Sequence, residues 1–403
     1  MVDADVVIVG AGPAGAAAAI VGVEAGLSVV LVDKATFPRD KVCGDGLTTG
    51  ALRILERLGV QPEAIGSWTG VDDVHVSGPS GHTVTFPLPR DRGAYAVVAP
   101  RAELDAAVVD RARKVGAEVI EGTEVVAAVD GTDTVTLTLG DGRELTSRYV
   151  IAADGMWSPL RKMLGTAVPG YLGEWRAFRQ YFNNTGPAAR DLWVWFEEDL
   201  LPGYAWSFPL PDGRANVGFG IQRGAKVTTK QMKALWPELL TRPHIAAVLG
   251  PDAQAEGRHQ AWPIPARVDE VPLTAGRVLW VGDAAAATDP MTGEGIGQAL
   301  LSGLLAIDAI TAGGDAPSAV RVHYEKAVQR ELVPDLKMSL LLIRALKHRK
   351  GARAAIRVAG LTAWTRRNFA RWLFEDEPRA VALTPRRWHR GFLKRDGAYN
   401  SGS

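Results

Sequence analysis

The stretch that decides the fold reads Val6-Val7-Ile8-Val9-Gly10-Ala11-Gly12-Pro13-Ala14-Gly15. A β-branched run passes directly into three spaced glycines, and alanine-rich sequence then continues to Ala25. A second β-branched run, residues 29–32, ends at Asp33. This order predicts a strand, a helix and a second parallel strand that together carry a dinucleotide-binding fingerprint.

Each position of the fingerprint has a physical task. Gly10 permits a tight turn, Gly12 lets a pyrophosphate approach the backbone, and Gly15 lets helix and strand pack closely. The phosphates would lie at the helix N-terminus, where unpaired N–H groups favour negative charge. Asp33 follows Gly15 by 18 residues, about where an acid accepts hydrogen bonds from an adenosine ribose. The fingerprint alone does not separate NAD from FAD.

Composition limits the class of protein. A chain of 403 residues suits two or three joined domains, and 47% hydrophobic with 23% charged residues is typical of a folded globular chain. The net charge of +1 hides an asymmetry, because residues 344–395 hold 15 Lys/Arg against 3 Asp/Glu. The single cysteine, Cys43, excludes a disulfide framework within the chain, and seven histidines without ligand spacing predict no metal site. A reducing cytoplasm is the expected compartment.

An uncharged run from Val6 to Val23 is long enough to suggest a membrane span. Asp3 and Asp5 stand where a signal peptide needs basic residues, and the fingerprint glycines interrupt the run. We therefore expect a soluble protein, or one that binds a membrane only peripherally.

Three later segments repeat the order found in a known flavoprotein family. Residues 278–281 read as a buried strand that ends in Gly282-Asp283, and a glycine-rich helix start follows at residues 290–297. Residues 149–155 end a further β-branched run in Asp-Gly, and Arg101 opens a separate segment. The pattern resembles the group-A flavoproteins with the p-hydroxybenzoate hydroxylase-like fold. Each of these markers alone is equally typical of a turn or a helix cap. Together, the resemblance implies FAD as the cofactor.

The resemblance also implies which residues contact the cofactor. The aspartate of the Gly-Asp pair would contact the ribityl chain, and the following helix N-terminus would face the flavin pyrimidine. The FAD-binding residues expected on this basis are Gly10, Gly12, Pro13, Ala14, Gly15, Asp33, Lys34, Cys43, Gly44, Arg101, Val125, Asp154, Gly155, Gly282, Asp283, Pro290, Gly293, Gly295 and Ile296.

Two further segments narrow the family. Residues 37–47 read Phe-Pro-Arg-Asp-Lys-Val-Cys-Gly-Asp-Gly-Leu, and residues 202–209 read Pro-Gly-Tyr-Ala-Trp-Ser-Phe-Pro. Both resemble the geranylgeranyl reductase family, and actinobacterial proteins that saturate the prenyl tail of menaquinone look most similar. The resemblance covers residues 1 to about 330. It implies a cysteine-glycine loop near the flavin and a Tyr-x-Trp-x-Phe-Pro segment that lines the substrate cavity.

The aromatic segment is informative without the family. Trp193 and Trp195 alternate with Val194, so both face one side of a strand, and the next strand repeats the pattern. An aromatic face of this size suits a long apolar ligand, or it packs on the core of its own sheet. We expect substrate contacts from Trp193, Trp195, Tyr204, Trp206, Phe208 and Pro209.

Reduction of an alkene needs a hydride and a proton on adjacent carbons. Reduced flavin supplies the hydride, and the protein must orient the bond and deliver the proton. Cys43 and Tyr204 are the candidates for positions near the reacting bond. Alternatively, Cys43 is a small buried residue that fills space in the core, and Tyr204 only lines the pocket. Arg39 and Lys41 suit a nicotinamide phosphate, an anionic flavin or a solvated loop. The sequence contains no second dinucleotide fingerprint, so electrons come from transiently bound NAD(P)H, another reductant or an electron-donor protein.

The predicted fold class is α/β, with a Rossmann-like FAD-binding domain, an antiparallel-sheet substrate domain and a C-terminal helical segment. The FAD-binding domain takes residues 1–70, 101–165 and 265–330. Residues 71–100 and 166–264 form the substrate domain, whose first hairpin joins residues 74–78 to 82–86.

Residues 331–403 form a basic helical region in this prediction. Met338, Leu341, Leu342 and Leu346 repeat at helical spacing, and basic residues and tryptophans accompany them. A basic helix with aromatics can bind an anionic membrane surface, or it can cap the more acidic remainder of the chain. Nucleic acid is not expected, because no nucleic-acid-binding motif accompanies the charge.

The leading functional hypothesis is an FAD-dependent reductase of isoprenoid double bonds, acting on a geranylgeranyl group or a prenyl quinone. The second is a flavin monooxygenase or halogenase on the same scaffold, since fold does not determine function. A halogenase would carry Trp-x-Trp-x-Ile-Pro at residues 204–209, which this chain lacks. The third is a non-catalytic flavoprotein or lipid carrier.

Overall fold

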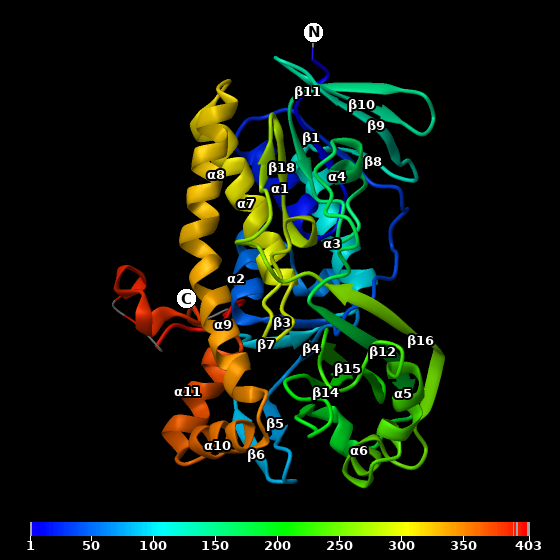
Figure 1. Cartoon of the computed structure of the whole chain (residues 1–403), viewed down its shortest axis with the longest axis vertical. Coiled ribbons are helices and arrows are strands. Elements are labelled where there is room, and N and C mark those ends of the chain that lie inside the picture. Colours follow the sequence, from blue (N-terminus) through cyan, green and yellow to red (C-terminus); the bar gives the residue numbers. More distant parts are fainter. Residues whose placement is uncertain (1, 390, 392–393, 401–403) are drawn as a thin grey trace.

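The computed structural model describes residues 2–389, 391 and 394–400 (Figure 1). The N-terminal unit has the predicted order: β1 (Ala4–Val9) leads into α1 (Pro13–Glu24), which returns to β2 (Val29–Val32). β1 and β2 pair in parallel, with Val6 opposite Val29. Nearly all their side chains are buried, as expected of uninterrupted apolar runs in a parallel sheet.

β1 lies in the middle of the first sheet, whose order is β17-β18-β11-β1-β2-β8. The pairings of β18 with β11, β11 with β1, β1 with β2, and β2 with β8 are parallel, while β9 and β10 extend β11 as an antiparallel hairpin. The loops that follow β1, β11 and β18 therefore meet at one edge, where such sheets bind ligands. The other strands are β8 (Glu118–Ile120), β9 (Val125–Asp130), β10 (Val135–Leu139), β11 (Glu144–Ala152), β17 (Thr274–Ala275) and β18 (Val278–Trp280).

Helices cover this sheet. α1 packs against α3 (Arg101–Val115) and α7 (Ile296–Gly313), and α7 packs against α8 (Pro317–Glu331). By length and composition α7 is apolar enough to cross a membrane, but 67% of it is buried inside the protein. Its place beside α8 in Figure 1 is that of a core helix. The shorter helices near this sheet are α2 (Thr49–Arg57) and α4 (Pro159–Met163).

The second sheet has the order β16-β12-β15-β14-β13-β5-β6, and all its pairings are antiparallel except that of β13 with β5. The predicted hairpin of β5 and β6 is confirmed. A small third sheet joins β3 and β4 through β7. The bounds are β5 (Asp73–Ser77), β6 (Thr83–Pro87), β12 (Trp175–Asn183), β13 (Leu192–Trp195), β14 (Tyr204–Leu210), β15 (Arg214–Gln222), β16 (Gln254–Ile264), β3 (Gly46–Thr48), β4 (Thr69–Gly70) and β7 (Ala96–Val98).

The strands of the two large sheets come from different parts of the chain. Those of the first sheet lie within residues 1–70, 101–165 and 265–330, and those of the second lie within 71–100 and 166–264. The predicted α/β fold class, with its separate antiparallel sheet, is confirmed. β7 is an exception to the segment division, because it belongs to 71–100 in sequence but pairs with strands from 1–70.

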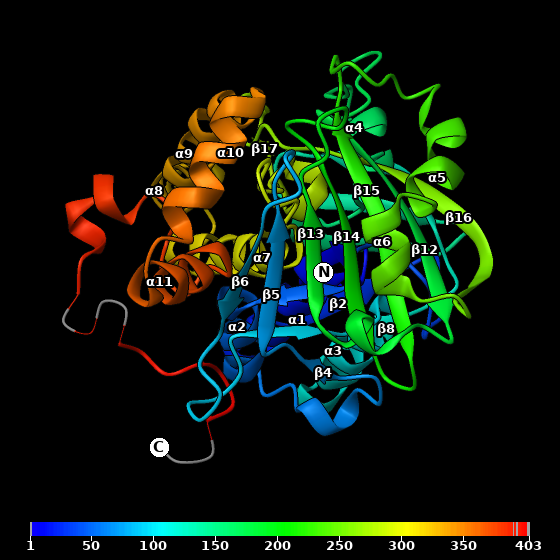
Figure 2. The ribbon, with the colours of Figure 1, turned by 90° about the horizontal axis from the view of Figure 1, so that it is seen from below.

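The second sheet has two unlike faces. α5 (Met232–Leu240) and α6 (Pro243–Leu249) pack on one face and bury Trp195 with other aromatics. Figure 2 shows α10 (Arg349–Ala359) and α11 (Ala363–Leu373) beside the β5–β6 edge, where Ile356 and Ala370 join the core.

The C-terminal region is helical, as expected. α8 and α9 (Val333–Leu346) run nearly end to end along the molecule (Figure 1). The apolar repeat that predicted α9 is not its core face: Leu341 is 55% exposed, and the core face is formed by Val333, Leu336 and Ile343. Both sets fit a helical period, and only the position of the helix against its neighbours chooses between them.

Candidate functional site

A cavity of about 930 Å³ lies between the first sheet and the second. The loops after β1, β11 and β18 form one wall, and β13 and β14 form another. The third wall is made by the C-terminal helices α9, α10 and α11. The cavity therefore joins the edge where dinucleotides bind to an apolar compartment.

The glycine loop closes tightly on the first sheet. Gly10 has φ of +101°, and a Cβ there would lie 2.3 Å from the carbonyl oxygen of Ala153. A Cβ on Gly15 would lie 1.8 Å from the carbonyl oxygen of Gly10. Gly15 thus lets the helix start approach the strand and is itself outside the cavity lining, while Gly10 lines it. These contacts are those expected of the fingerprint.

Two guanidinium groups face the start of α1. A Cβ on Gly12 would lie 3.7 Å from Arg39 Nη2 and 3.9 Å from Arg101 Nη2, so the backbone there is open toward both cations. Asp105 holds the cations in place: Arg101 donates to both its carboxylate oxygens at 2.7 and 2.8 Å, and Arg39 Nη1 lies 3.0 Å away. A helix N-terminus flanked by two arginines is a site for a pyrophosphate.

Asp33 stands at the end of β2 and lines the cavity with Lys34. Its carboxylate accepts hydrogen bonds from the backbone N–H groups of Ala11 and Ala35, at 2.7 and 2.8 Å. Each carboxylate oxygen has further acceptor capacity, so these bonds orient the side chain beside the glycine loop without exhausting it. Val125 lies in the same part of the lining.

Asp154, after β11, carries an unsatisfied atom. Its Oδ2 accepts from the N–H of Leu160 at 2.9 Å, whereas its buried Oδ1 has no hydrogen-bond partner among the described residues. Burial raises the pKa of this carboxyl to about 6, and the Leu160 bond opposes that shift. Buried polar atoms are rarely left unpaired, so Asp154 faces the place of a polar ligand group.

The flavin markers converge on the cavity. Asp283 and Gly282 follow β18, and the loop from Pro290 to Ile296 leads into α7. Every expected cofactor residue except Gly15 lines the cavity. The open glycine backbone, the paired arginines and the unpaired Asp154 oxygen fit the pyrophosphate and polar edges of FAD.

The cysteine loop lies between the cofactor wall and the second sheet. Asn216 donates to the Cys43 carbonyl at 2.9 Å and to Asp45 Oδ2 at 2.8 Å, and the hydroxyl of Tyr181 donates to the same oxygen at 2.6 Å. Burial and the charge of Asp45 raise the pKa of Cys43 to about 11, so its thiol is protonated at neutral pH. Burial raises the pKa of Asp45 itself to about 6. Arg179 donates to the Cys43 carbonyl and fixes the loop further.

The aromatic wall is built by β14. Tyr204, Trp206 and Phe208 line the cavity on one face of the strand. Glycines in adjacent segments make room for the aromatic rings. A Cβ on Gly218 would lie 2.3 Å from Trp206, and a Cβ on Gly44 would lie 3.3 Å from Phe208. The Trp206 indole donates to Asn216, which links this wall to the cysteine loop.

Three expected substrate contacts need correction. Trp193, Trp195 and Pro209 lie outside the cavity lining. The register pairs Trp193 with Ser207 and Val194 with Trp206. Directly paired residues share a face of the sheet, so the two tryptophans of β13 point to the α5–α6 side. Alternation within each strand was predicted correctly, but the relative phase of the two strands was not.

Lys41, for which the sequence left a nicotinamide phosphate, an anionic flavin and a solvated loop open, lines the cavity, and further cavity residues were not assigned from the sequence. Lys41 places its Nζ 3.5 Å from the centroid of the Trp262 ring, and burial lowers its pKa to about 8 against the opposing charge of Asp283. Glu294 lies within the Thr-Gly-Glu-Gly-Ile-Gly run. Its position between Gly293 and Gly295, two of the expected cofactor residues, is a sequence signal that could have placed it in the cavity. The C-terminal contribution was not assigned to the cavity, although Leu342 and Leu346 belong to the apolar repeat seen in the sequence. It comprises Leu342, Ala345, Leu346, Ala355, Ile356, Phe369, Trp372, Leu373 and Phe374.

Fold and site together define a dinucleotide-binding flavoprotein with an apolar compartment. The chain belongs to the FAD binding domain family, whose sequence model matches residues 3–303. It is an FAD-dependent oxidoreductase.

Comparison with known proteins gives the same picture. The chain is 35% identical over 347 residues to the menaquinone reductase of Mycolicibacterium smegmatis, covering 80% of this chain and 81% of that one. It is 31% identical over 325 residues to digeranylgeranylglycerophospholipid reductase 1 of Methanopyrus kandleri, covering 75% and 79%. A geranylgeranyl bacteriochlorophyll reductase-like protein of Thermoplasma acidophilum has a similar structure, with a TM-score of 0.79, 21% identity and coverage of 96% and 99%.

Proposed function

We propose that the chain reduces carbon–carbon double bonds of an isoprenoid chain, such as a geranylgeranyl group or the prenyl tail of menaquinone. The observation that carries this proposal is the continuity of the flavin site with an apolar compartment. The similarity to a menaquinone reductase and to a digeranylgeranylglycerophospholipid reductase supports it.

The compartment matches a hydrocarbon ligand. Val194 and Phe196 extend the aromatic wall of β14, and Leu342, Leu346 and Phe369 face them from the C-terminal helices. Such a lining offers few hydrogen bonds and orients a long chain by shape and apolar contact. The wall of Trp206 and Phe208 would place one double bond against the flavin and exclude water from it.

Bound reduced FAD supplies a hydride equivalent to one carbon of the double bond. The chain's own residues would bind the cofactor through the glycine loop and the Arg39–Arg101 pair. We assign Cys43 and Tyr204 to the reacting centre. The Tyr204 hydroxyl donates a hydrogen bond to the Thr292 carbonyl, which fixes the tyrosine ring. The protonated Cys43 thiol adds a small neutral surface. Two electrons per bond come from NAD(P)H or another reductant, including an electron-donor protein.

We further propose that α9–α11 bind an anionic membrane surface. Their inner sides line the cavity, and Ala345 and Ala355 both line it and reach solvent. Leu341, Val358 and Trp364 on these helices, and Leu361 between α10 and α11, are between 55% and 70% exposed. Exposed basic residues surround them, namely Arg344, Lys347, Lys350, Arg357 and Arg367. Apolar anchors within a basic field suit anionic lipid, and a prenyl tail could then enter directly from the bilayer.

The test is anaerobic incubation of the dithionite-reduced protein with a prenyl quinone and, separately, with geranylgeranyl diphosphate. Mass spectrometry should show a gain of two hydrogens per reduced bond in at least one of them. No gain in either, together with a gain of one oxygen on an aromatic substrate in air, would instead establish a monooxygenase.

A further inference from the structure

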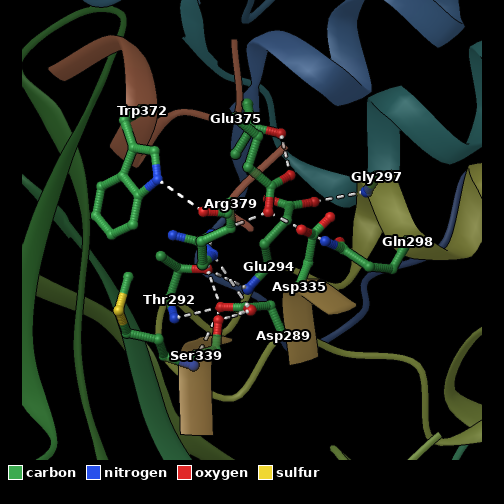
Figure 3. Close-up of polar contacts among 12 residues, drawn as sticks. Asp289, Thr292, Glu294, Gly297, Gln298, Asp335, Ser339, Trp372, Glu375 and Arg379 are labelled. Carbon is green, nitrogen blue, oxygen red and sulfur yellow. Dashed lines mark hydrogen bonds and ion pairs between the residues drawn. The ribbon is translucent and has the colours of Figure 1, made fainter. Parts of the chain in front are cut away.

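Four carboxyl groups gather behind the loop that leads into α7 (Figure 3). Asp289 and Glu294 belong to that loop, Glu375 follows α11, and Asp335 lies on α9. The side chain of Arg379, 1% exposed, enters the group from the C-terminal segment. Buried like charges at this density repel one another unless cations or protons compensate them.

The cation serves two of these carboxylates. Arg379 Nη2 donates to Glu375 Oε1 at 3.0 Å, and its Nε lies 3.4 Å from Asp289 Oδ2. Asp289 also accepts from the backbone N–H and the hydroxyl of Thr292 and from the hydroxyl of Ser339. Asp289 is therefore compensated by a cation and by neutral donors on both of its oxygens.

The other two carboxylates differ from each other. Asp335 has its own cation, because Arg387 Nη1 donates to both of its oxygens at 2.9 and 3.0 Å. Glu375 has additional neutral donors, the hydroxyl of Thr48 at 3.2 Å and the amide of Gln298 at 3.1 Å. Three of the four acids are therefore compensated by arginine.

Glu294 is the exception. Its Oε1 accepts from the N–H of Gly297 at 2.5 Å, and no lysine or arginine among the described residues forms an ion pair with it. It is 7% exposed. Burial and the neighbouring charges of Glu375 and Asp289 raise its pKa to about 8. Glu294 is therefore the member of the cluster that keeps a proton at neutral pH.

Glu294 also belongs to the cavity lining. It lines the cavity with Tyr204, Thr48 and Phe374. A Cβ on the preceding Gly293 would lie 3.6 Å from the Tyr204 hydroxyl, so the loop contacts the aromatic wall directly.

We propose that Glu294, as a neutral carboxylic acid, supplies the proton for reduction of the isoprenoid double bond. This inference rests on the proposed function. A hydride from reduced flavin forms a C–H bond with one carbon, the π bond breaks, and the Glu294 O–H proton forms the second C–H bond with the adjacent carbon. The flavin is oxidised by two electrons, Glu294 becomes a carboxylate, and water restores its proton. Arg379 and Glu375 act as positioning residues, because they determine the charge that Glu294 faces.

Infrared titration gives a readout independent of turnover. The FAD-loaded wild-type protein should show the carbonyl band of a protonated carboxylic acid that disappears as the pH rises through about 8. Glu294→Gln should lack this band. Glu375→Gln should move its disappearance to lower pH, because one neighbouring negative charge is removed. The charged and titratable groups around Glu294 are Asp289, Glu375, Arg379, Asp335, Tyr204 and Cys43.

Single-turnover reduction in deuterated water tests the transfer itself. Glu294→Gln should slow prenyl reduction by about 10² to 10⁴-fold, the usual contribution of a general acid. Glu294→Asp should recover part of the rate, and exposed Glu118→Gln should match the wild type. FAD content and circular dichroism establish that each variant folds.

The outcomes separate the two proposals. A wild-type protein that reduces no prenyl substrate overturns the proposed function and the inference with it. A wild-type protein that reduces the bond while a folded Glu294→Gln variant remains within threefold of its rate overturns the inference alone. So does a wild-type infrared band that survives in Glu294→Gln.

Discussion

Asp105 offers the sharpest test of how the pyrophosphate site is built. Its side chain is fully buried on α3 and is the shared partner of Arg101 and Arg39. Asp105→Asn removes the charge while keeping the shape of the side chain. Two guanidinium groups, 9% and 21% exposed in their side chains, are then left close together without their counter-charge.

The magnitude follows from burial. Breaking a buried ion pair by removing one partner costs about 3–5 kcal/mol, because the remaining charge stays buried. The unfolding entropy of a chain of this length is about 0.8 kcal/mol per degree, so the cost corresponds to a fall in Tm of roughly 4 to 6 °C. The partial exposure of Arg39 favours the lower end of this range.

Asp110 on the same helix is the matched control. It pairs with Arg113 at 2.7 Å, but its side chain is 60% exposed. Exposed pairs contribute about 0–1 kcal/mol, so Asp110→Asn should change Tm by little more than a degree. The assay is thermal unfolding of the FAD-free proteins followed by circular dichroism. Equal shifts in Tm for the two variants would refute the assignment of a buried charge cluster to Asp105.

The other predictions concern the cavity and the surface. Trp206→Leu should raise the KM for a prenyl substrate about tenfold or more, since it removes roughly 2 kcal/mol of apolar contact. Trp193→Leu should leave the KM unchanged, because that ring lies on the other face of the sheet. A rise in KM for both variants would contradict the register of β13 and β14. Trp364→Ser should weaken cosedimentation with anionic vesicles roughly tenfold. Val129→Ser, at a similarly exposed position outside α9–α11, should leave cosedimentation unchanged. Equal binding of vesicles by both variants would exclude α9–α11 as the membrane-binding surface. Cys43 should alkylate slowly at neutral pH and faster as the pH approaches its pKa of about 11, because the reactive thiolate forms there. Rapid labelling of the folded protein at neutral pH would show that the pKa of this thiol is not raised.

Much of the fold was predictable because its signals are local. The glycine fingerprint, the β-branched runs and the Asp-Gly and Gly-Asp strand ends each specify a short structure through sterics and hydrogen bonding within a few residues. The antiparallel pairings of β5 with β6 and of β13 with β14 followed from alternation and turn residues in the same way. The cofactor wall could be predicted because its residues belong to these local motifs.

The substrate wall could be predicted only in part. Alternation in β13 shows that Trp193 and Trp195 share a face, but it does not say which face is shared with Trp206. A shift of one residue in the pairing reverses that relation. The observed register places Val194, not the tryptophans, beside Trp206.

By itself, then, the sequence determined the β1–α1–β2 unit with its glycine loop and the β5–β6 hairpin, since each depends on contacts among near neighbours in the chain. Tertiary structure alone decided what closes the cavity and which acid holds a proton. Glu294 and Glu375 are 81 positions apart in sequence, and their pKa values depend on burial and on each other. Burial and long-range electrostatics arise only when distant segments pack together, so no local pattern encodes them.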